Sequence, residues 1–446
     1  MSHEAATPDG TRRSPARDRG LRVGVDARLA DGRAGGVQQF VIGLATGLSG
    51  LGDGDEEYVF LAHREDGGWL EQYVHGPSRI LWLDQSAEPV TSPSPGQRLR
   101  HAFGERAPAV RALWRDIRPR RTPQVIEIPA SDGTIEEAGV DLMHFPFQAA
   151  FTTSVPSIYQ PWDLQHVHLP EFFGETERRW RDVTYRAFCQ QARLVVVASS
   201  WTKQDLVATF GVDARKIAVI GVPAVTSTYE TPAPEALVHV RGTFSLPPRF
   251  LFYPAQTWPH KNHVRLLAAL RMLRDERDME VHLVCSGARN AHFGRLEAEV
   301  RRLGLDHNVQ FIGFVDPVQV RALYALARAM VFPSLFEGWG LPVLEAFMAG
   351  LPVACSNVTS LPDLVDDAAL VFDPTDVRAI ADAIARLWRE DDLGRMLAER
   401  GRRIATGYDW DHTARMYRAL YRVTAGRPLT AADRALVGES HLDLTP

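Results

Sequence analysis

Short runs of β-branched and other apolar residues recur along the chain, separated by amphipathic stretches. Such runs are typical of strands buried in a parallel sheet, and the stretches between them suit crossover helices. The pattern predicts two series of strands. They are residues 21–26, 58–62, 79–83, 141–145, 193–199 and 216–221, followed by 249–254, 281–287, 309–314, 329–334, 352–356 and 369–373.

The two series predict an α/β fold with two doubly wound, Rossmann-like domains. A chain of 446 residues also exceeds what one hydrophobic core usually supports. A Pro-rich interval after Ile220 separates the series. The predicted divisions are a disordered tail at 1–20, a first domain at 21–222, a linker at 223–245, a second domain at 246–406, a last helix at 407–425 and a tail at 426–446.

One insertion does not fit the alternating scheme. Residues 85–136 are rich in Pro and Arg and contain a predicted amphipathic helix near 97–117. This segment could touch a membrane surface or an acceptor. A solvated insertion whose apolar side folds onto the domain is the better supported interpretation, because runs of charge are usually solvated faces.

Composition narrows the function classes. The formal net charge of −5 provides no overall basic field, so we expect no nucleic-acid partner. The start of the chain lacks the apolar core of a signal peptide, and no run of about 18 apolar residues could span a bilayer. Cys189, Cys285 and Cys355 lie far apart in apolar surroundings, as packing residues do in a reducing compartment. We therefore expect a cytoplasmic protein.

The segment "AMVFPSLFEGWGLPVLEAFMAG" carries the first candidate chemistry. A strand is expected to end near Pro333, a loop to carry Glu337, and a helix to begin at a proline, with Glu345 in its first turn. Free backbone N–H groups at Gly340 and Leu341 would then suit a phosphate. The two carboxylates could bind hydroxyls of a sugar and a ribose beside that phosphate. Alternatively, Glu345 merely complements the helix dipole and Glu337 is a surface residue.

Three further segments could line the same site. Lys261 in "YPAQTWPHKN" follows a predicted strand, where a lysine can contact a phosphate. Glycines 35 and 36 precede a predicted helix and would let the backbone approach a ligand, but they do not form the GxGxxG fingerprint of a dehydrogenase. Backbone near Val315 could bond a nucleobase. His260 and His263 have no third ligand at suitable spacing, so we expect no metal site.

Taken in order, these segments resemble the retaining glycosyltransferases of family 4, from about Leu21 to Tyr421. The motifs that carry the resemblance are "GGVQQF", "VVVASSWTKQDLVATFGVDARKIAVI", "PHKN", "FPSLFEGWGLPVLEA" and "TSLPDLVDDAALVFDP". The resemblance implies the GT-B architecture, with a first domain that binds the acceptor and a second that binds the nucleotide sugar. It also implies that the last helix crosses back to the first domain, with Trp410 as a packing anchor.

The same resemblance implies roles for individual residues. Glu337 would hold hydroxyls of the transferred sugar, Glu345 the ribose, and backbone at Val315 the base. The residues implied to contact the diphosphate region of the donor are Gly35, Gly36, Gln256, Lys261, Gly340 and Leu341. The donor would be a GDP- or UDP-linked hexose, with mannose slightly favoured by the "PHKN" subgroup. The acceptor would be a saccharide, a lipid-linked or a small-molecule hydroxyl, and catalysis would need no metal.

Two positions depart from the family pattern. Gln256 stands where an arginine is usual, which is similar to a subgroup with the pattern "PAQ-x-WPHKN". Trp162 stands where a histidine that reaches the donor sugar is usual, so either Asp163 or His166 compensates, or catalysis is altered or lost. A non-catalytic subunit that binds a nucleotide sugar and partners an active transferase therefore stays open as the alternative. A dehydrogenase is a distant third.

Overall fold

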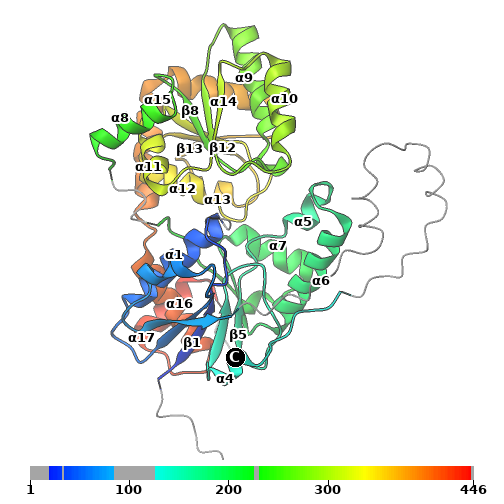
Figure 1. Cartoon of the computed structure of the whole chain (residues 1–446), viewed down its shortest axis with the longest axis vertical. Coiled ribbons are helices and arrows are strands. Elements are labelled where there is room, and N and C mark those ends of the chain that lie inside the picture. The colour runs from blue at the N-terminus through cyan, green and yellow to red at the C-terminus, as the bar shows by residue number, and fades with distance from the viewer. Residues whose placement is uncertain (1–19, 33–34, 85–125, 226–230, 443–446) are drawn as a thin grey trace, which may run out of the picture.

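The computed structural model describes residues 20–32, 35–84, 126–225 and 231–442. Two α/β domains lie one above the other (Figure 1), each with a parallel sheet between helices. This confirms the predicted fold class. The predicted helix near 97–117, and the contact that it could make with a membrane or an acceptor, lie outside the described residues.

The first sheet has seven strands, all paired in parallel. Six of the strands coincide with predicted runs, whereas β5 was not predicted, because it is only three residues long. In spatial order the strands are β3 (Ser78–Leu83), β2 (Glu57–His63), β1 (Arg22–Asp26), β4 (Leu142–Phe145), β5 (Ser157–Tyr159), β6 (Leu194–Val197) and β7 (Ile217–Val219).

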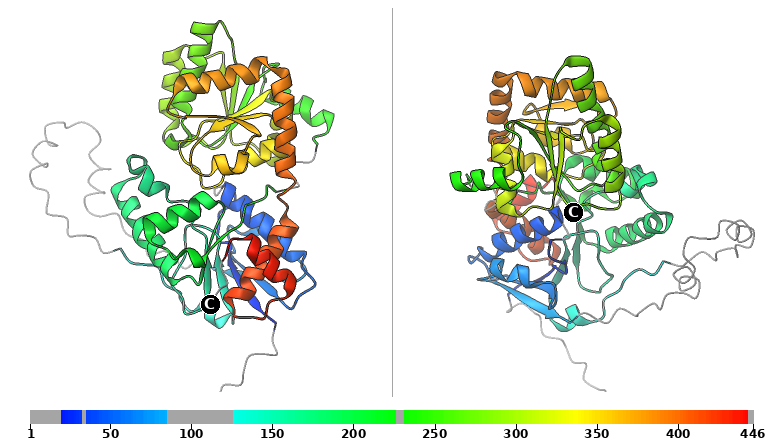
Figure 2. Two further views of the ribbon diagram at one scale, coloured as in Figure 1. Left: turned by 180° about the vertical axis from the view of Figure 1, so that it is seen from behind. Right: turned by 45° about the horizontal axis from the view of Figure 1, so that its top comes forward.

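Amphipathic helices cover both faces of this sheet (Figures 1 and 2). In α1, Phe40, Val41, Leu44 and Leu48 are fully buried, because their spacing places them on one side of the helix. The helical elements of the first domain before the linker are α1 (Gly36–Ser49), η1 (Gly68–Tyr73), α4 (Thr134–Glu137), α5 (Gln165–His168), η2 (Pro170–Phe172), α6 (Glu175–Gln191), α7 (Ser200–Phe210) and η3 (Ala214–Lys216).

The second sheet has six parallel strands, all within predicted runs. In spatial order they are β10 (Val309–Gly313), β9 (Leu283–Ser286), β8 (Leu251–Pro254), β11 (Ala329–Phe332), β12 (Val353–Ser356) and β13 (Ala369–Phe372). The helical elements are α8 (Pro234–Thr243), η5 (Pro259–Lys261), α9 (His263–Arg277), α10 (Phe293–Leu303), α11 (Pro317–Leu326), α12 (Leu341–Met348), α13 (Leu361–Val365), α14 (Val377–Arg389) and α15 (Asp391–Ala405).

The chain returns to the first domain after α15. Helix α16 (Trp410–Thr424) packs against α1 (Figure 1), as the resemblance implied. Trp410 is 6% exposed, and its indole N–H donates to the Ala224 carbonyl at 3.1 Å. An ideal Cβ on Gly43 would lie 1.9 Å from the Trp410 ring, so α1 has no room for a side chain there. Trp410 therefore anchors the crossover.

Two helices lie in segments predicted to be irregular. Helix α8 falls in the predicted linker and packs on α11, and α17 (Ala431–Glu439) falls in the predicted C-terminal tail and packs on α16. A buried ion pair of 2.8 Å between Arg422 of α16 and Asp433 holds α17 in place, and Arg422 also contacts Glu56 at 2.6 Å. Within the part of the chain that the structure describes, no helix is both long and apolar enough to cross a bilayer.

Candidate active site

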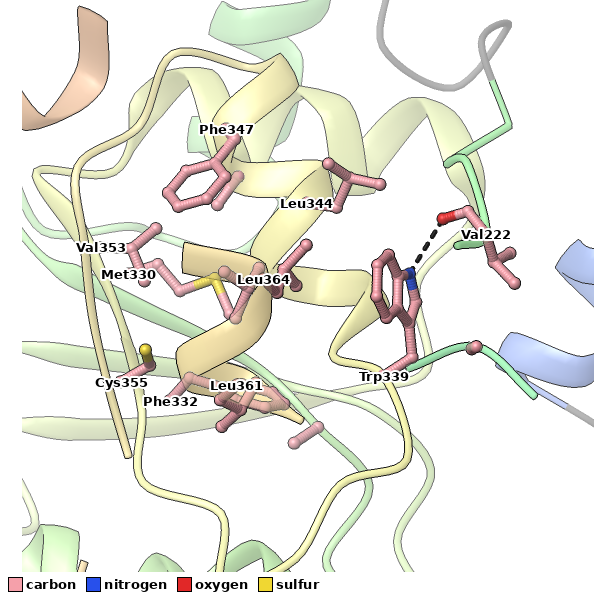
Figure 3. Close-up of a cluster of buried hydrophobic side chains, with 14 of the residues drawn as sticks. Val222, Met330, Phe332, Trp339, Leu344, Phe347, Val353, Cys355, Leu361 and Leu364 are labelled. Carbon is pink, nitrogen blue, oxygen red and sulfur yellow. Dashed lines mark hydrogen bonds between the residues drawn. The ribbon is translucent and has the colours of Figure 1, made fainter. Parts of the chain in front are cut away.

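The loop between β11 and α12 carries Glu337, and Trp339 of the same loop belongs to a closely packed core (Figure 3). Asn262 fixes the start of the loop by donating from its amide to the Pro333 carbonyl at 2.9 Å. Thr359 accepts the Glu337 backbone N–H at 3.1 Å, and Ser360 donates to the Glu337 carbonyl at 3.0 Å. The backbone of Glu337 is therefore held on both sides by its own domain.

The far end of the loop is tied to the first domain. Trp339 is 7% exposed, and its indole N–H donates to the Val222 carbonyl at 2.9 Å (Figure 3). The ring also packs edge-on against Tyr408, with the ring centroids 5.5 Å apart. The Glu337 loop thus lies where the interdomain connections meet.

Lys261 reaches the Glu337 carboxylate. Its Nζ donates to Glu337 Oε1 at 2.5 Å, and the two side chains are only 18% and 13% exposed. The Tyr253 hydroxyl, which is buried under the loop, donates to the Lys261 carbonyl at 2.6 Å and fixes the short η5 turn. The lysine that we predict to contact a diphosphate and the glutamate that we predict to contact a sugar are therefore neighbours.

Asp163 of the first domain faces this pair. Gly338, the residue after Glu337, lies next to Asp163, because an ideal Cβ on Gly338 would be 3.4 Å from the Asp163 Cβ. Burial raises the pKa of Asp163, and the nearby Glu337 carboxylate raises it further. The Gln165 backbone N–H, which donates to Asp163 Oδ1 at 3.0 Å, and the positive charge of Lys261 act in the opposite direction. Two carboxylates and one ammonium group thus share the interdomain site.

The N-terminus of α12 faces the glycine turn of the first domain. Gly340 adopts φ = +105°, a conformation that side chains rarely allow, and among the described residues no side chain caps this helix end. An ideal Cβ on Gly36 would lie 3.9 Å from Leu341 Cδ2, and one on Gly35 would lie 3.5 Å from Gln256 Nε2. The structure therefore brings these five predicted donor-binding residues together across the domain boundary.

Gln256 is held by its neighbour in the same loop. The Trp258 indole N–H donates to Gln256 Oε1 at 2.8 Å. Because the amide oxygen accepts this bond, the Nε2 group points away from Trp258. Nε2 is the Gln256 atom that lies toward Gly35. Gln256 thus offers N–H donors where the family usually offers a guanidinium.

Glu345 lies one residue deeper in the helix than predicted. Helix α12 begins at Leu341, so Glu345 falls in its second turn, and the first turn carries no acidic residue. The Tyr324 hydroxyl from α11 donates to Glu345 Oε2 at 2.8 Å. Val315 stands just before α11 and is 7% exposed, whereas the preceding Phe314 is 68% exposed. The ribose and base assignments stay predictions.

His166 is not brought to this site. It is fully buried inside the first domain, where its ring packs against Tyr185 and Phe210, and burial lowers its pKa to about 4. The histidine at the domain boundary is His168, two residues on, which we did not predict. Its ring stacks on Phe336 with the centroids 5.3 Å apart. A four-residue helix cannot be oriented from sequence periodicity, so no sequence signal distinguishes the two histidines.

The Trp162 side chain packs against its own domain. Its ring packs edge-on against Phe40 at 5.1 Å, and its indole N–H donates to the Pro146 carbonyl at 3.0 Å. The side chain is therefore part of the packing between α1 and the β4 loop. What Trp162 presents to the second domain is its backbone carbonyl, which faces Gly338.

Histidines next to Lys261 are neutral at ordinary pH. Burial lowers the pKa of His260 to about 2 and that of His263 to about 3, and the nearby Lys261 ammonium lowers both further. In the described residues no group of three or more His, Cys, Asp or Glu side chains could hold a metal ion.

Comparisons with known proteins identify the family. A family model described as "Glycosyl transferases group 1" matches residues 239–404, and one described as "Glycosyltransferase Family 4" matches residues 34–223. Together they cover both domains on either side of the linker. The chain belongs to the family 4 glycosyltransferases, which have the GT-B fold.

Individual relatives agree with this assignment. The O-antigen chain mannosyltransferase B of Escherichia coli is 29% identical over 339 residues, which span 76% of this chain and 86% of the relative. Sucrose-phosphate synthase from Thermosynechococcus elongatus aligns over 90% of this chain and 98% of its own, with a TM-score of 0.66 and 20% identity. The Anabaena protein HepE in complex with UDP-glucose aligns over 90% of this chain and 100% of its own, with a TM-score of 0.65 and 19% identity.

Proposed function

We propose that this glycosyltransferase transfers a hexose from a nucleotide diphosphate sugar to an acceptor hydroxyl, with retention of the anomeric configuration. The second domain, residues 246–406, would bind the donor, and the first domain, residues 21–222, would bind the acceptor. The observation that carries the proposal is the contact of 2.5 Å between Lys261 and Glu337 beside the open N-terminus of α12.

This arrangement suits a ligand that has both phosphates and hydroxyls. A diphosphate would take the Lys261 ammonium and the backbone N–H groups of Gly340 and Leu341 as partners, because a helix N-terminus favours negative charge. The Glu337 carboxylate, released from the lysine, would then accept hydrogen bonds from hydroxyls of the sugar. A single donor molecule therefore gives each of the two charged side chains a partner of its own.

The same groups support the chemical step. When the bond between the sugar and the diphosphate breaks, negative charge develops on the leaving oxygen, and Lys261 and the α12 N-terminus stabilise it. The new bond forms from the acceptor oxygen to the same sugar carbon, on the face that the diphosphate leaves, and the proton of the acceptor hydroxyl passes to the departing diphosphate oxygen. Asp163, beside Glu337, faces this region from the acceptor-binding domain, where its carboxylate would orient a hydroxyl. Close contact of the domains excludes water and so favours transfer over hydrolysis.

Mannose is the favoured hexose, because one relative is a mannosyltransferase by name. This relative, O-antigen chain mannosyltransferase B, aligns with 76% of this chain. The donor nucleotide would be GDP or UDP. The acceptor would be a saccharide, a lipid-linked or a small-molecule hydroxyl, the compartment the cytoplasm, and no metal would be required.

The experiment incubates purified protein with GDP-mannose, UDP-glucose and related donors, with and without EDTA, and follows sugar release and acceptor glycosylation by NMR. We expect turnover of one donor, insensitivity to EDTA, and a product with the anomeric configuration of the donor. Lys261→Met should reduce turnover at least about a hundredfold, because a dedicated charge-stabilising group is lost. Arg271→Met, which removes an equal charge from the exposed side of α9, is the matched control. Activity in Lys261→Met equal to that of the control would refute the proposal.

A non-catalytic, sugar-nucleotide-binding partner subunit is the alternative function. It is motivated by Trp162, whose side chain turns toward α1 instead of offering an imidazole to the donor. In that case the wild-type protein binds a nucleotide sugar without turnover, and Trp162→His raises turnover from this baseline. A fully active wild-type enzyme that gains nothing from Trp162→His excludes the alternative.

A further inference from the structure

Two hydroxyl groups of the first domain contact the loop that carries Glu337. Ser199 caps α7, where its Oγ accepts the Thr202 backbone N–H at 3.1 Å. The Ser199 Oγ also donates to the Gly338 carbonyl at 3.1 Å, and the Thr202 Oγ1 lies within donating distance of the same carbonyl at 3.3 Å. The two hydroxyl oxygens are 2.8 Å apart, and the residues are 2% and 0% exposed. A shielded hydroxyl pair thus holds one carbonyl of the other domain.

The other side of Gly338 is also in contact with the first domain. An ideal Cβ on Gly338 would lie 2.2 Å from the Trp162 carbonyl oxygen, so the position has no room for a side chain. Phe336, the residue before Glu337, packs against His168 and Trp201, with ring centroids 5.3 Å and 5.4 Å away. The first domain therefore contacts the loop on both sides of Glu337.

The backbone of Glu337 itself is held by the second domain, through Thr359 and Ser360. Gly338 is the next residue, and its carbonyl is held by the first domain. A change in the distance between the domains must therefore tilt the peptide that follows Glu337. The direction of the Glu337 side chain depends on this peptide, because the loop is short and tightly packed.

We propose that Ser199 and Thr202 are positioning residues, whose hydroxyls hold the Gly338 carbonyl when the domains are closed and so direct Glu337 toward the donor sugar. This inference rests on the proposed function for the role of Glu337. Neutral hydrogen bonds suit the task, because their modest net strength lets the domains separate again for product release. Catalysis is thereby coupled to domain closure.

Steady-state kinetics of three single variants test the inference. Thr202→Val keeps the shape of the side chain but removes its hydroxyl, and we expect kcat to fall about tenfold, because small misplacements of a catalytic group are costly. The dissociation constant for the nucleotide should change less than about twofold, since Lys261 and the N-terminus of α12, which we propose to contact the diphosphate, lie in the second domain. Thr202→Ser should restore kcat. Thr184→Val is the matched control, because Thr184 is equally buried and its hydroxyl donates within α6, to the Trp180 carbonyl.

Two outcomes would overturn the inference. Unchanged kcat in Thr202→Val would show that the hydroxyl does not position Glu337, and an equal loss in Thr202→Ser would show that the effect comes from packing. Both tests require that the wild-type enzyme is active and that Glu337→Ala loses turnover.

A structural measurement separates this inference from the proposed function. Small-angle scattering compares the wild type with Ser199→Gly/Thr202→Val, a double variant that lacks both hydroxyls but keeps an acceptable helix cap. We expect a larger radius of gyration for the double variant, because the domains separate more often. Equal radii would overturn the inference, whether or not any donor is turned over.

Discussion

Gly338→Ala tests how the domains meet at the catalytic loop with the smallest possible change. The added Cβ would lie 2.2 Å from the Trp162 carbonyl oxygen, whereas real Cβ atoms essentially never come closer than 3.0 Å to such an atom. The contact must therefore lengthen by about 0.8 Å, from 2.2 Å to at least 3.0 Å. Because the obstacle is backbone, no side-chain rotation relieves it. Either the domains separate or the Glu337 loop tilts.

A displacement of this size is large for catalysis. A misplacement of about 1 Å can reduce turnover about a hundredfold, and we expect a loss of this order in kcat. The diphosphate-binding groups at Lys261 and Gly340 belong to the second domain and should keep the nucleotide dissociation constant within about threefold of the wild-type value. Initial rates over a range of donor concentrations, together with calorimetric titration of the nucleotide, measure the two effects separately.

Gly294→Ala is the matched control for this experiment. An ideal Cβ on Gly294 meets nothing within 4 Å, and the residue lies on the exposed side of α10 in the same domain. The same substitution there should leave kcat unchanged and raise the stability of the helix slightly. If Gly338→Ala retained the kcat of this control, the close interdomain contact at Gly338 would not be part of the catalytic conformation, and the reasoning would be refuted.

Three further predictions concern the site and the fold. Glu337→Ala should lower kcat at least about a hundredfold with little change in nucleotide affinity, whereas Glu345→Ala should mainly weaken nucleotide binding in calorimetry; equal activity in both variants would contradict the assignments. Burial lowers the pKa of His144 and His263 to about 3. Both stay neutral in the folded protein while their unfolded forms take up protons below about pH 6.5. The free energy of unfolding is therefore largest above pH 6.5 and falls on acidification. Between pH 7.5 and 5.5 the two histidines together lower it by about 3 kcal/mol. Urea unfolding at both pH values checks this, and pH-independent stability would contradict it. Arg422→Met leaves two buried carboxylates unpaired and should cost about 3–5 kcal/mol in the same assay, whereas a loss below about 1 kcal/mol would show that the ion pairs are dispensable.

The strands were the most predictable part of the fold. Twelve of thirteen strands coincide with runs identified from the sequence, because strands buried on both faces need continuous apolar residues. Strand β5 (Ser157–Tyr159) was missed, because three residues are too few to show a pattern. Helices α8 and α17 were missed because they are short and mostly exposed, and contacts with α11 and α16 stabilise them.

The candidate site could be predicted where glycine, proline and charge mark a helix start. The spacing of Gly340 and Pro342 placed the beginning of α12 within a residue, and Lys261 was expected at the same sheet edge. The depth of Glu345 in the helix was wrong by one residue, because the helix begins at Leu341 and not at Pro342. Sequence reasoning finds which elements approach the site but is less accurate about which face each side chain occupies.

Contacts between the domains could not be predicted from the sequence. His166 and His168 lie two residues apart, yet one is buried against Tyr185 and the other stacks on Phe336 from the second domain. The hydroxyls of Ser199 and Thr202 look like an ordinary helix start, and only the tertiary structure places a carbonyl of the other domain against them. Such contacts join residues more than a hundred positions apart, and local patterns do not encode them.

Calorimetric titration of the wild-type protein and of Lys261→Met with GDP, UDP, ADP and dTDP and their common sugar conjugates tests the central claim most directly. The claim is that Lys261, Glu337 and the α12 N-terminus together form a nucleotide sugar site. We expect one nucleoside diphosphate to bind the wild type clearly in preference to the others, and Lys261→Met to weaken that binding at least about tenfold. Failure of every nucleotide to bind the wild type, or equal binding by Lys261→Met, would contradict the claim.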